Sequence, residues 1–494
     1  MTNDYDIVII GGDLAGYKAA LEAIQLQAKV ALVQPQVNYE LNHNYVLREL
    51  SKISRQCLEI ANIGIINHTE NTELTNKLQT PKIHSNSCNY SDQQAILYAQ
   101  NITANFNQVN SLTNLATQGV DVIIGKGKFQ TSKKLNFVVN NRILKGRSYI
   151  LACGSCPNIP NIEGLQNTGY LTLANIWQSL EKSNLPKNWV IIGGLPQSIE
   201  IAQTLAHLGC SINLILNHPS FLSHLEPEIG QLLIAELEAD GIRVFNKINI
   251  SQVRKIENKK WLQAGNKAIE TDEILVATGQ QPNIEDLNLA AAGVKWYPHR
   301  LVINKKLQTT NQRIYACGDV IGGYDIPNIA NYEAKIAVKN ALFFNRNTVN
   351  YSDLPWVINS QSTVAQVGLT ERQAKHRYGT KEVLVFKNYF KTLTAAQIKN
   401  EITGICKLIV LKNGKILGCS ILGAAAGELI NLISLAMSKN LKIENLGKLA
   451  VVYPSYAEIL EQTAREWSQQ KLHQNHNLQE FLQSFFHLRR DWNL

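Results

Sequence analysis

Residues 5–34 read YDIVIIGGDLAGYKAALEAIQLQAKVALVQ, and this stretch decides the fold. Residues 7–10 form a continuous β-branched run, as expected for a parallel strand that is buried on both faces. A glycine pair that starts at Gly11 ends the strand, and apolar residues at helical spacing then predict a helix from about Leu14. Residues 30–33 predict the next strand. The stretch should therefore form a βαβ unit that places a pyrophosphate at the N-terminus of its helix.

The glycine fingerprint of this unit is incomplete. The pattern G-x-G-x-x-G has Gly11 and Gly16 in its first and third positions, but Asp13 replaces the glycine that lets the backbone approach the phosphates. Gln34 stands where an acidic residue would bind the ribose. In one interpretation a dinucleotide is still bound, by Gly11, Gly12, Asp13, Gly16 and Gln34. In the other, Asp13 caps its helix and its carboxylate occupies the phosphate site.

Length and composition restrict the class of protein. A chain of 494 residues is long enough for about three domains. No apolar run reaches the length of about 18 residues that a membrane span needs, and the first strand starts too early for a signal peptide, which predicts a cytoplasmic protein. The net charge of +9 is scattered, so a nucleic-acid partner is not expected. The eight cysteines show no disulfide framework.

A second βαβ pattern, NWVIIGGLPQSIEIAQTLAHLGCSINLILN, occupies residues 188–217. Its fingerprint keeps the pair Gly193 and Gly194, but Leu195 and Ser198 replace the second and third glycines. Asn217 stands at the position of the ribose-binding acid. This unit therefore either binds a second nucleotide weakly or is a folded relic that binds none.

Six motifs in order resemble the pyridine nucleotide-disulfide oxidoreductases, the family of lipoamide dehydrogenase, glutathione reductase and mercuric reductase. They are GGDLAGY, ACGS, ATGQQPN, IYACGDV, VGLTERQA and YPSYAE, and the resemblance runs from Tyr5 to about Trp467. It implies an α/β fold with two Rossmann-like nucleotide-binding domains, for FAD and NAD(P), and a C-terminal α+β dimerisation domain. The implied FAD domain is 1–150 and 275–350, the NAD(P)-binding-like domain 151–274, the dimerisation domain 351–467, and a helical tail 468–494.

The resemblance also implies roles for single residues. Asp319 of IYACGDV would bind the ribityl chain of the flavin, as a lone carboxylate among glycines that accepts hydrogen bonds from hydroxyls. The glycines of the three central motifs, Gly154, Gly279 and Gly318, would line the cofactor sites. Glu200 matches a family carboxylate near the reactive edge of the flavin, or it is a partly exposed helix residue without a function.

The departures from the family concern the redox chemistry. The family has a C-x4-C disulfide after the second strand, whereas this chain has no cysteine between Gln34 and Arg48, which excludes dithiol chemistry there. Cys153 and Cys156 have thioredoxin-like spacing, but they follow a strand where the family has ATGS-x-P. Reactive thiols of this type lie at helix N-termini, so we interpret Cys153 as a replaced threonine.

The C-terminal motif H-P-T-x-x-E of the family also differs. Tyr453 occupies the histidine position and Glu458 is kept, so proton relay is not expected at Tyr453, whose hydroxyl could still bind an acceptor. Mercuric reductase also has a tyrosine there, but its terminal metal-binding cysteine pair is absent from RRDWNL, and no metal is expected. In the tail, apolar residues including Leu478 and Trp492 recur at helical spacing, and packing on their own domain is favoured over a membrane surface.

Two functions remain open. One is a homodimeric FAD-dependent oxidoreductase that transfers hydride or electrons from NAD(P)H to an unidentified small-molecule acceptor without a redox-active disulfide. Its catalytic residues would be Tyr453, Glu458 and Glu200. The other is a redox-inactive dimeric binding or regulatory protein that kept the fold and lost the nucleotide chemistry.

Overall fold

The computed structural model describes residues 3–35, 46–50, 92–109, 111–131, 135–176, 185–216, 221–323 and 325–492. Asn217, the candidate ribose-site residue of the second βαβ pattern, lies outside these ranges. The chain divides into two compact units, the first formed by Met1–Ser220 and Glu238–Val349, the second by Phe221–Leu237 and Asn350–Leu494. Among the described residues, no helix is long and apolar enough to cross a membrane.

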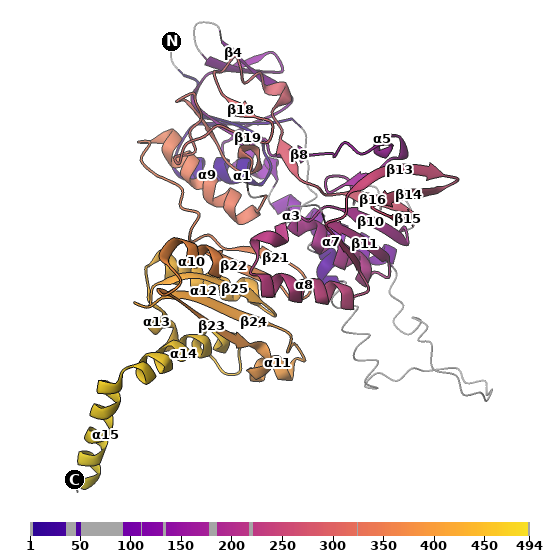
Figure 1. The fold of residues 1–494 in the computed structure, drawn as a ribbon. Coiled ribbons are helices and arrows are strands. Elements are labelled where there is room, and N and C mark those ends of the chain that lie inside the picture. The colour runs from indigo at the N-terminus through magenta and orange to yellow at the C-terminus, as the bar shows by residue number, and fades with distance from the viewer. Residues whose placement is uncertain are drawn as a thin grey trace, which may run out of the picture. The chain divides into compact units, whose positions relative to one another are not determined.

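The predicted first βαβ unit forms the centre of a five-stranded parallel sheet in the first unit. The strand order is β20-β7-β1-β2-β3. Helix α1 connects β1 to β2 and lies beside α9 (Figure 1). Ile7, Val8 and Ile9 are fully buried, which confirms the prediction that this strand is covered on both faces. The bounds are β1 Tyr5–Ile10, α1 Leu14–Gln25, β2 Val30–Gln34, β3 Asp121–Ile124, β7 Gly146–Leu151, β20 Ile314–Ala316 and α9 Pro327–Leu342.

The second βαβ pattern is also confirmed. It forms part of another five-stranded parallel sheet, with the order β12-β11-β10-β16-β9. Trp189 and Val190 of its central strand are fully buried, so the apolar run again decides the position of the strand. The bounds are β9 Leu171–Thr172, β10 Asn188–Ile192, α7 Pro196–His207, β11 Ser211–Leu216, β12 Arg243–Asn246 and β16 Glu273–Val276.

Smaller elements complete the first unit. Two three-stranded antiparallel sheets, β4-β5-β6 and β13-β14-β15, and the two-stranded pairs β17-β8 and β18-β19 accompany the two parallel sheets. Their bounds, with the remaining helices, are α3 Asp92–Val109, α4 Leu112–Thr117, β4 Gly127–Thr131, β5 Leu135–Val139, β6 Arg142–Leu144, β8 Ser155–Pro157, α5 Leu165–Thr168, β13 Ile250–Ile256, β14 Lys259–Ala264, β15 Lys267–Thr271, β17 Gln280–Pro282, η2 Glu285–Leu287, β18 Trp296–Tyr297, β19 Arg300–Leu301 and η3 Asp319–Ile321.

The second unit is built on an antiparallel sheet with the order β21-β22-β25-β24-β23. Helices α12 and α14 pack on one face of this sheet around a core that includes Leu408 and Trp467. The bounds are η1 Phe221–His224, α8 Pro227–Ala239, β21 Trp356–Ile358, β22 Val364–Gly368, α10 Glu371–Tyr378, β23 Val383–Tyr389, η4 Phe390–Thr392, α11 Thr394–Ile398, β24 Ile405–Leu411, β25 Ile416–Leu422, α12 Ala426–Ser438, α13 Ile443–Gly447, α14 Glu458–Gln474 and α15 His476–Asp491.

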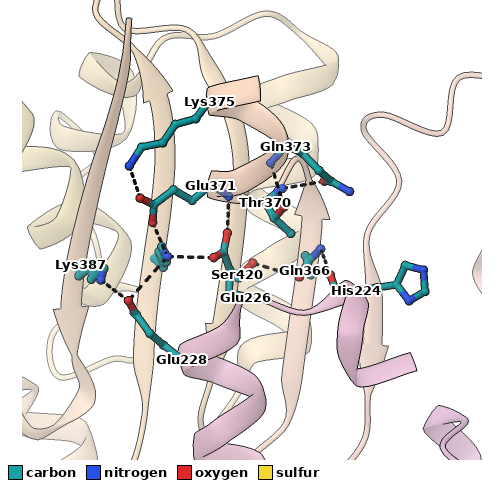
Figure 2. Close-up of polar contacts among 11 residues, drawn as sticks. His224, Glu226, Glu228, Gln366, Thr370, Glu371, Gln373, Lys375, Lys387 and Ser420 are labelled. Atoms are coloured by element: carbon teal, nitrogen blue, oxygen red, sulfur yellow. Dashed lines mark hydrogen bonds and ion pairs between the residues drawn. The ribbon is translucent and has the colours of Figure 1, made fainter. Parts of the chain in front are cut away.

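A buried ion-pair cluster holds the segment 221–237 on this unit (Figure 2). The Lys407 ammonium on β24 lies 2.9 Å from Glu226 Oε2 and 2.7 Å from Glu371 Oε2. Successive side chains of a strand point to opposite faces, so Lys407 points away from the face on which its neighbour Leu408 packs. The Lys407 and Glu226 side chains are only 3% and 2% exposed. The segment is therefore attached through charges that have little access to water.

Candidate nucleotide site and C-terminal motif

The geometry of the turn after β1 explains why glycine occupies the first and third positions of the fingerprint. Gly11 has a φ of +106°, and a Cβ on it would overlap the carbonyl oxygen of Ala152 at the end of β7. A Cβ on Gly16 would overlap the carbonyl oxygen of Gly11. Gly11 thus allows the turn to approach the end of β7, and Gly16 allows α1 to approach the turn. A Cβ on Gly12 would lie 3.2 Å from Gln34 Cβ, so β2 borders the same turn.

Asp13 occupies the N-cap position of α1, but its carboxylate does not cap the helix. The residue has extended backbone angles, and its side chain makes no capping hydrogen bond to the described residues of α1. Instead, Gln34 Nε2 donates to Asp13 Oδ1 (3.0 Å), while Gln34 Oε1 accepts from the Gly12 amide (2.5 Å). Burial raises the pKa of Asp13 above its ordinary value. The prediction that Asp13 caps its own helix is therefore wrong, because Gln34, 21 positions later, holds the carboxylate.

Asp319 is brought to the same turn. A Cβ on Gly318 would lie 2.9 Å from the Cβ of Ala15 in the first turn of α1, and the Gly318 amide donates to Glu333 Oε2 (2.8 Å). Asp319 shares a side-chain hydrogen bond with Asp325, and burial together with the charges of Asp325, Glu333 and Asp13 raises the pKa of Asp319 to about 8. The prediction of a lone carboxylate is thus wrong. Asp325 and Glu333 are missed by sequence reasoning, since no motif singles them out.

The second βαβ turn repeats the geometry of the first. Gly193 has a φ of +141°, and a Cβ on it would overlap the carbonyl oxygen of Ala277, at the end of β16. Leu195 is the N-cap residue of α7 and gives no side-chain capping bond to the described residues of that helix. Ser198 is buried, and its hydroxyl donates to the Leu195 carbonyl (2.7 Å). This turn therefore keeps its backbone contact while it accommodates two side chains in place of glycines.

The remaining glycines of the motifs differ in their surroundings. Gly154 has a φ of +66°, and the nearest atom to a Cβ built there is Asp13 Oδ2 at 3.8 Å, which places it at the first turn. Gly279 has a φ of +148°, and a Cβ there meets no described atom within 4 Å. Gly194 follows Gly193 and is buried. The structure thus brings Gly154 together with Asp13, while Gly194 follows β10 and Gly279 lies between β16 and β17.

Glu200 is not the partly exposed residue that its sequence position suggested. It lies on α7 with only 4% of its surface accessible, because that helix is buried along nearly its whole length. One turn earlier, Gln197 Nε2 donates to the backbone oxygen of Asp325 (3.0 Å). The N-terminal turn of α7 therefore contacts the loop that carries the hydrogen-bond partner of Asp319. Gln197 is a second residue that sequence reasoning missed.

The Cys153 thiol has the properties of a structural side chain. It is buried at the end of β7, and burial raises the pKa of Cys153 to about 12. Cys156 lies in β8, which pairs with β17 rather than starting a helix. Because the thiolate is the reactive form of cysteine, this geometry supports the interpretation of Cys153 as a replaced threonine.

The C-terminal motif lies in the second unit. Tyr453 is 70% exposed, and its hydroxyl lies 3.3 Å from Thr394 Oγ1. Glu458 is the first residue of α14, and its Oε1 accepts from the Ser455 amide (2.8 Å). The carboxylate thus fixes the turn after Tyr453, while the tyrosine ring is accessible to a ligand or to another protein.

The first turn fits the diphosphate of a dinucleotide. Within the described residues, the amide groups of the first turn of α1 are not bonded by Asp13, so they keep the orientation that favours an anion. Asp13 opposes this with a nearby negative charge, but its raised pKa makes the neutral form more accessible. The residues that could hold FAD are Gly11, Gly12, Asp13, Gly16, Gln34, Gly154, Gly318 and Asp319.

Comparison with known protein families agrees with this architecture. The model described as pyridine nucleotide-disulphide oxidoreductase matches residues 5–337, and the dimerisation-domain model of the same family matches residues 354–464. Mercuric reductase of Staphylococcus aureus is 29% identical over 476 residues, which cover 93% of this chain and 82% of that protein. Dihydrolipoyl dehydrogenase of Bacillus subtilis (strain 168) is 27% identical over 486 residues, which cover 93% and 95%.

Solved structures share the fold at lower sequence identity. The HOCl-induced flavoprotein disulfide reductase RclA of Escherichia coli superposes with a TM-score of 0.79 at 22% identity and covers 94% of this chain and 99% of its own. LpdA of Mycobacterium tuberculosis gives a TM-score of 0.80 at 18% identity, with 93% and 99% covered. These likenesses confirm the predicted fold class, two nucleotide-binding-type α/β sheets followed by a dimerisation domain.

Proposed function

Because this chain belongs to the pyridine nucleotide-disulphide oxidoreductase family, whose members are FAD-dependent and use NAD(P)H, we propose that it is a flavoenzyme without a redox-active disulfide. It would pass electrons from NAD(P)H to a small acceptor directly from the flavin. The observation that carries the proposal is the first βαβ turn, where the backbone keeps its anion-binding geometry although Asp13 replaces a glycine. A homodimer in the cytoplasm is part of this proposal.

Each residue of the first turn would contact a particular part of the cofactor. The amide groups at the start of α1 would hold the diphosphate, and Gln34, which already bonds Asp13 and Gly12, would rotate or share its amide with the adenosine ribose. Asp319 would accept hydrogen bonds from the ribityl hydroxyls, while the hydrogen bond that it shares with Asp325 would hold its carboxyl group in place. When bound, FAD would supply the redox group that accepts electrons from NAD(P)H and donates them to the acceptor.

Two observations support electron transfer without a dithiol. The chain has no cysteine between Gln34 and Cys57, where the family has its redox pair. The Cys153 thiol, whose Cα lies 2.6 Å from a Cβ built on Gly11 of the first turn, is disfavoured as a thiolate because of its burial. The acceptor would therefore react at the flavin site itself.

NAD(P)H would bind at the second βαβ turn and at the N-terminus of α7. Gly193 keeps the tight contact there, but the side chains of Leu195 and Ser198 reduce the room for a diphosphate. We therefore propose weak NAD(P)H binding with little selection between NADH and NADPH. Glu200, buried on the same helix, would be a positioning residue rather than an exposed acid.

At the C-terminal motif, Tyr453 would donate a hydrogen bond to the acceptor. A phenol hydroxyl replaces the histidine ring that the family uses for proton transfer, so Tyr453 would orient the acceptor rather than relay protons. Glu458, which accepts from the Ser455 amide, would hold the turn that carries Tyr453.

A redox-inactive dimeric protein is the second candidate, and Asp13 is the observation that favours it. Two unit charges 4 Å apart repel by about 1 kcal/mol in water and about 4 kcal/mol at an effective dielectric of 20. That corresponds to about one to three powers of ten in affinity, which could leave the site without FAD at cellular concentrations.

One spectroscopic experiment distinguishes the two candidates. The purified full-length protein is incubated with excess FAD, desalted, and its visible spectrum recorded before and after anaerobic addition of NADH or NADPH. We expect a yellow protein whose flavin absorbance is bleached by either nucleotide, and the same result for Cys153→Ser, the matched variant. A folded, colourless protein after this treatment would favour the redox-inactive candidate. A flavin that stays oxidised after one equivalent of NADH or NADPH in the parent, but is bleached in Cys153→Ser, would restore a dithiol mechanism, because the two electrons would then rest on a disulfide of the parent.

A further inference from the structure

The C-terminal helix α15 carries an apolar face that its own unit does not cover. None of its 16 residues is buried, and Figure 1 shows the helix extending away from the sheet of the second unit. The face consists of Leu478, Phe481, Leu482, Phe485, Leu488 and Trp492, which recur at spacings of one turn. Phe481 and Trp492 are 62% and 70% exposed. The prediction that this tail packs on its own domain is therefore wrong.

An uncovered helix of 16 residues is only just above the length at which isolated helices are marginal in water. Isolated helices of about 12–15 residues or fewer are marginal in water even when they are rich in alanine, and most helical stability in proteins comes from packing of the apolar face. Asn475 caps α15 by accepting from the Leu478 amide (3.1 Å), and Gln479 Nε2 donates to the Leu472 carbonyl (3.0 Å). These two bonds fix where the helix starts, but they bury no apolar surface. A partner surface is needed.

The charges on α15 argue against a membrane as that partner. Arg489 and Arg490 are balanced by Glu480 and Asp491, so the helix has no net formal charge when its histidines are neutral. Helices that lie on anionic membranes carry an excess of lysine and arginine on the polar face, and polybasic lipid-binding segments have about four to eight of them. The polar residues of α15 are instead a mixture of amides, one hydroxyl, histidines and balanced charges, without the basic excess that an anionic membrane would favour.

The position of α15 in the chain identifies the partner. Helix α14 begins inside the region that matches the dimerisation domain, residues 354–464, and its Trp467 is buried in the core of the second unit. Beyond Trp467 the chain leaves that core, and α15 follows after the single residue Asn475. We infer that the apolar face of α15 packs against the second copy of this chain and extends the subunit interface of the homodimer.

Subunit exchange tests this inference directly. Two preparations of the full-length protein, labelled with donor and acceptor dyes, are mixed and their exchange followed by energy transfer. Phe481→Ala and Phe485→Ala together keep helix propensity but remove two aromatic rings, and should accelerate exchange at least tenfold. Gln483→Ala, on the opposite face of α15, is the matched control and should leave exchange unchanged.

Trp492 reports where the helix lies. The difference in fluorescence between the parent and Trp492→Phe should show a blue-shifted emission in the dimer, which becomes solvent-like after dilution into monomers. Equal exchange rates in all variants would overturn the inference. The inference would also be overturned if Trp492 stays shielded from solvent in monomers, because the helix would then pack on its own chain. It would likewise be overturned if Trp492 is shielded only when vesicles of equal zwitterionic and anionic lipid are added, because the helix would then bind a membrane.

Discussion

Replacing Lys407 with methionine should destabilise the second unit by about 3–5 kcal/mol, the range for removing one partner of a buried ion pair. The ammonium has two carboxylates within hydrogen-bond distance, Glu226 at 2.9 Å and Glu371 at 2.7 Å, and a third, Glu228, at 3.9 Å. Without it, the Glu226 carboxylate, only 2% exposed, is left with an uncompensated charge. Because domains are stable by only about 5–15 kcal/mol, the loss is a large fraction of the total.

The matched control is Lys412→Met, which breaks the ion pair with Glu382. That pair spans 3.4 Å, and its side chains are 55% and 57% exposed, so its removal should cost at most about 1 kcal/mol. A rescue variant combines Lys407→Met with Glu226→Gln. The amide oxygen of glutamine can still accept from the Glu371 amide, as Glu226 Oε1 does, and the uncompensated charge is gone. We expect it to recover a substantial part of the lost stability.

Two measurements follow this perturbation. Urea unfolding gives the overall loss, and hydrogen exchange gives its location, which should be the segment 221–237 together with β24. Hydrogen bonds from Lys375 and Lys407 lower the pKa of Glu371 to about 2, so its contribution to stability is present above about pH 4.5 and is lost as the pH falls toward 2. In Lys407→Met the pKa of Glu371 should lie closer to its ordinary value, so less stability should be lost over this pH range. If Lys407→Met costs no more than Lys412→Met, the cluster does not hold the segment in place.

Three further predictions concern the candidate site. Asp13→Gly should raise the FAD content per chain, because it removes a negative charge from the phosphate site while the helix loses no capping bond. The flavin is released by heat and measured, and an unchanged FAD content in a folded variant would contradict this account. Since the pKa of Asp319 is raised to about 8, Asp319 keeps its proton in the folded protein and loses it in the unfolded chain between about pH 4 and 8. Its contribution to stability should therefore be lost, and the thermal midpoint should fall, as the pH rises through this window. Asp319→Asn should flatten that dependence, and an identical pH profile in both proteins would refute the assignment. Tyr453→Phe should slow reoxidation of the reduced flavin by about two- to tenfold, the effect of one hydrogen bond, whereas Thr394→Val, which removes only the partner of the hydroxyl, should not; stopped-flow absorbance measures both.

The sequence was sufficient where local pattern and burial agree. The run from Ile7 to Ile10 and the helical spacing after Leu14 predict β1 and α1 correctly, because a strand covered on both faces has few alternatives. The same reasoning places β10 and α7. These are the elements on which the candidate nucleotide turns are built.

It was insufficient where a side chain is held by a distant partner. The direction of the Asp13 carboxylate depends on Gln34, which the fingerprint assigns to the ribose and not to Asp13. The raised pKa of Asp319 depends in part on Asp325, which no motif includes. Lys407 and Glu226 are 181 positions apart, so no local pattern pairs them. The sequence predicts that Glu200 is partly exposed, whereas the residue is buried. Helix α7 is covered along nearly its whole length, so the periodicity of its sequence does not distinguish a solvent-exposed face from a buried one.

Two glycines pack directly against a carbonyl oxygen of a neighbouring strand end. Gly11 faces Ala152, and Gly193 faces Ala277. Any L-amino acid at either position would collide with the backbone of the neighbouring strand, whether or not a cofactor is ever bound. Purifying selection on folding alone would preserve both glycines in a lineage that had abandoned redox chemistry. The residues that record the history of ligand binding are instead those free to change without unfolding the sheet, such as Asp13 and Leu195.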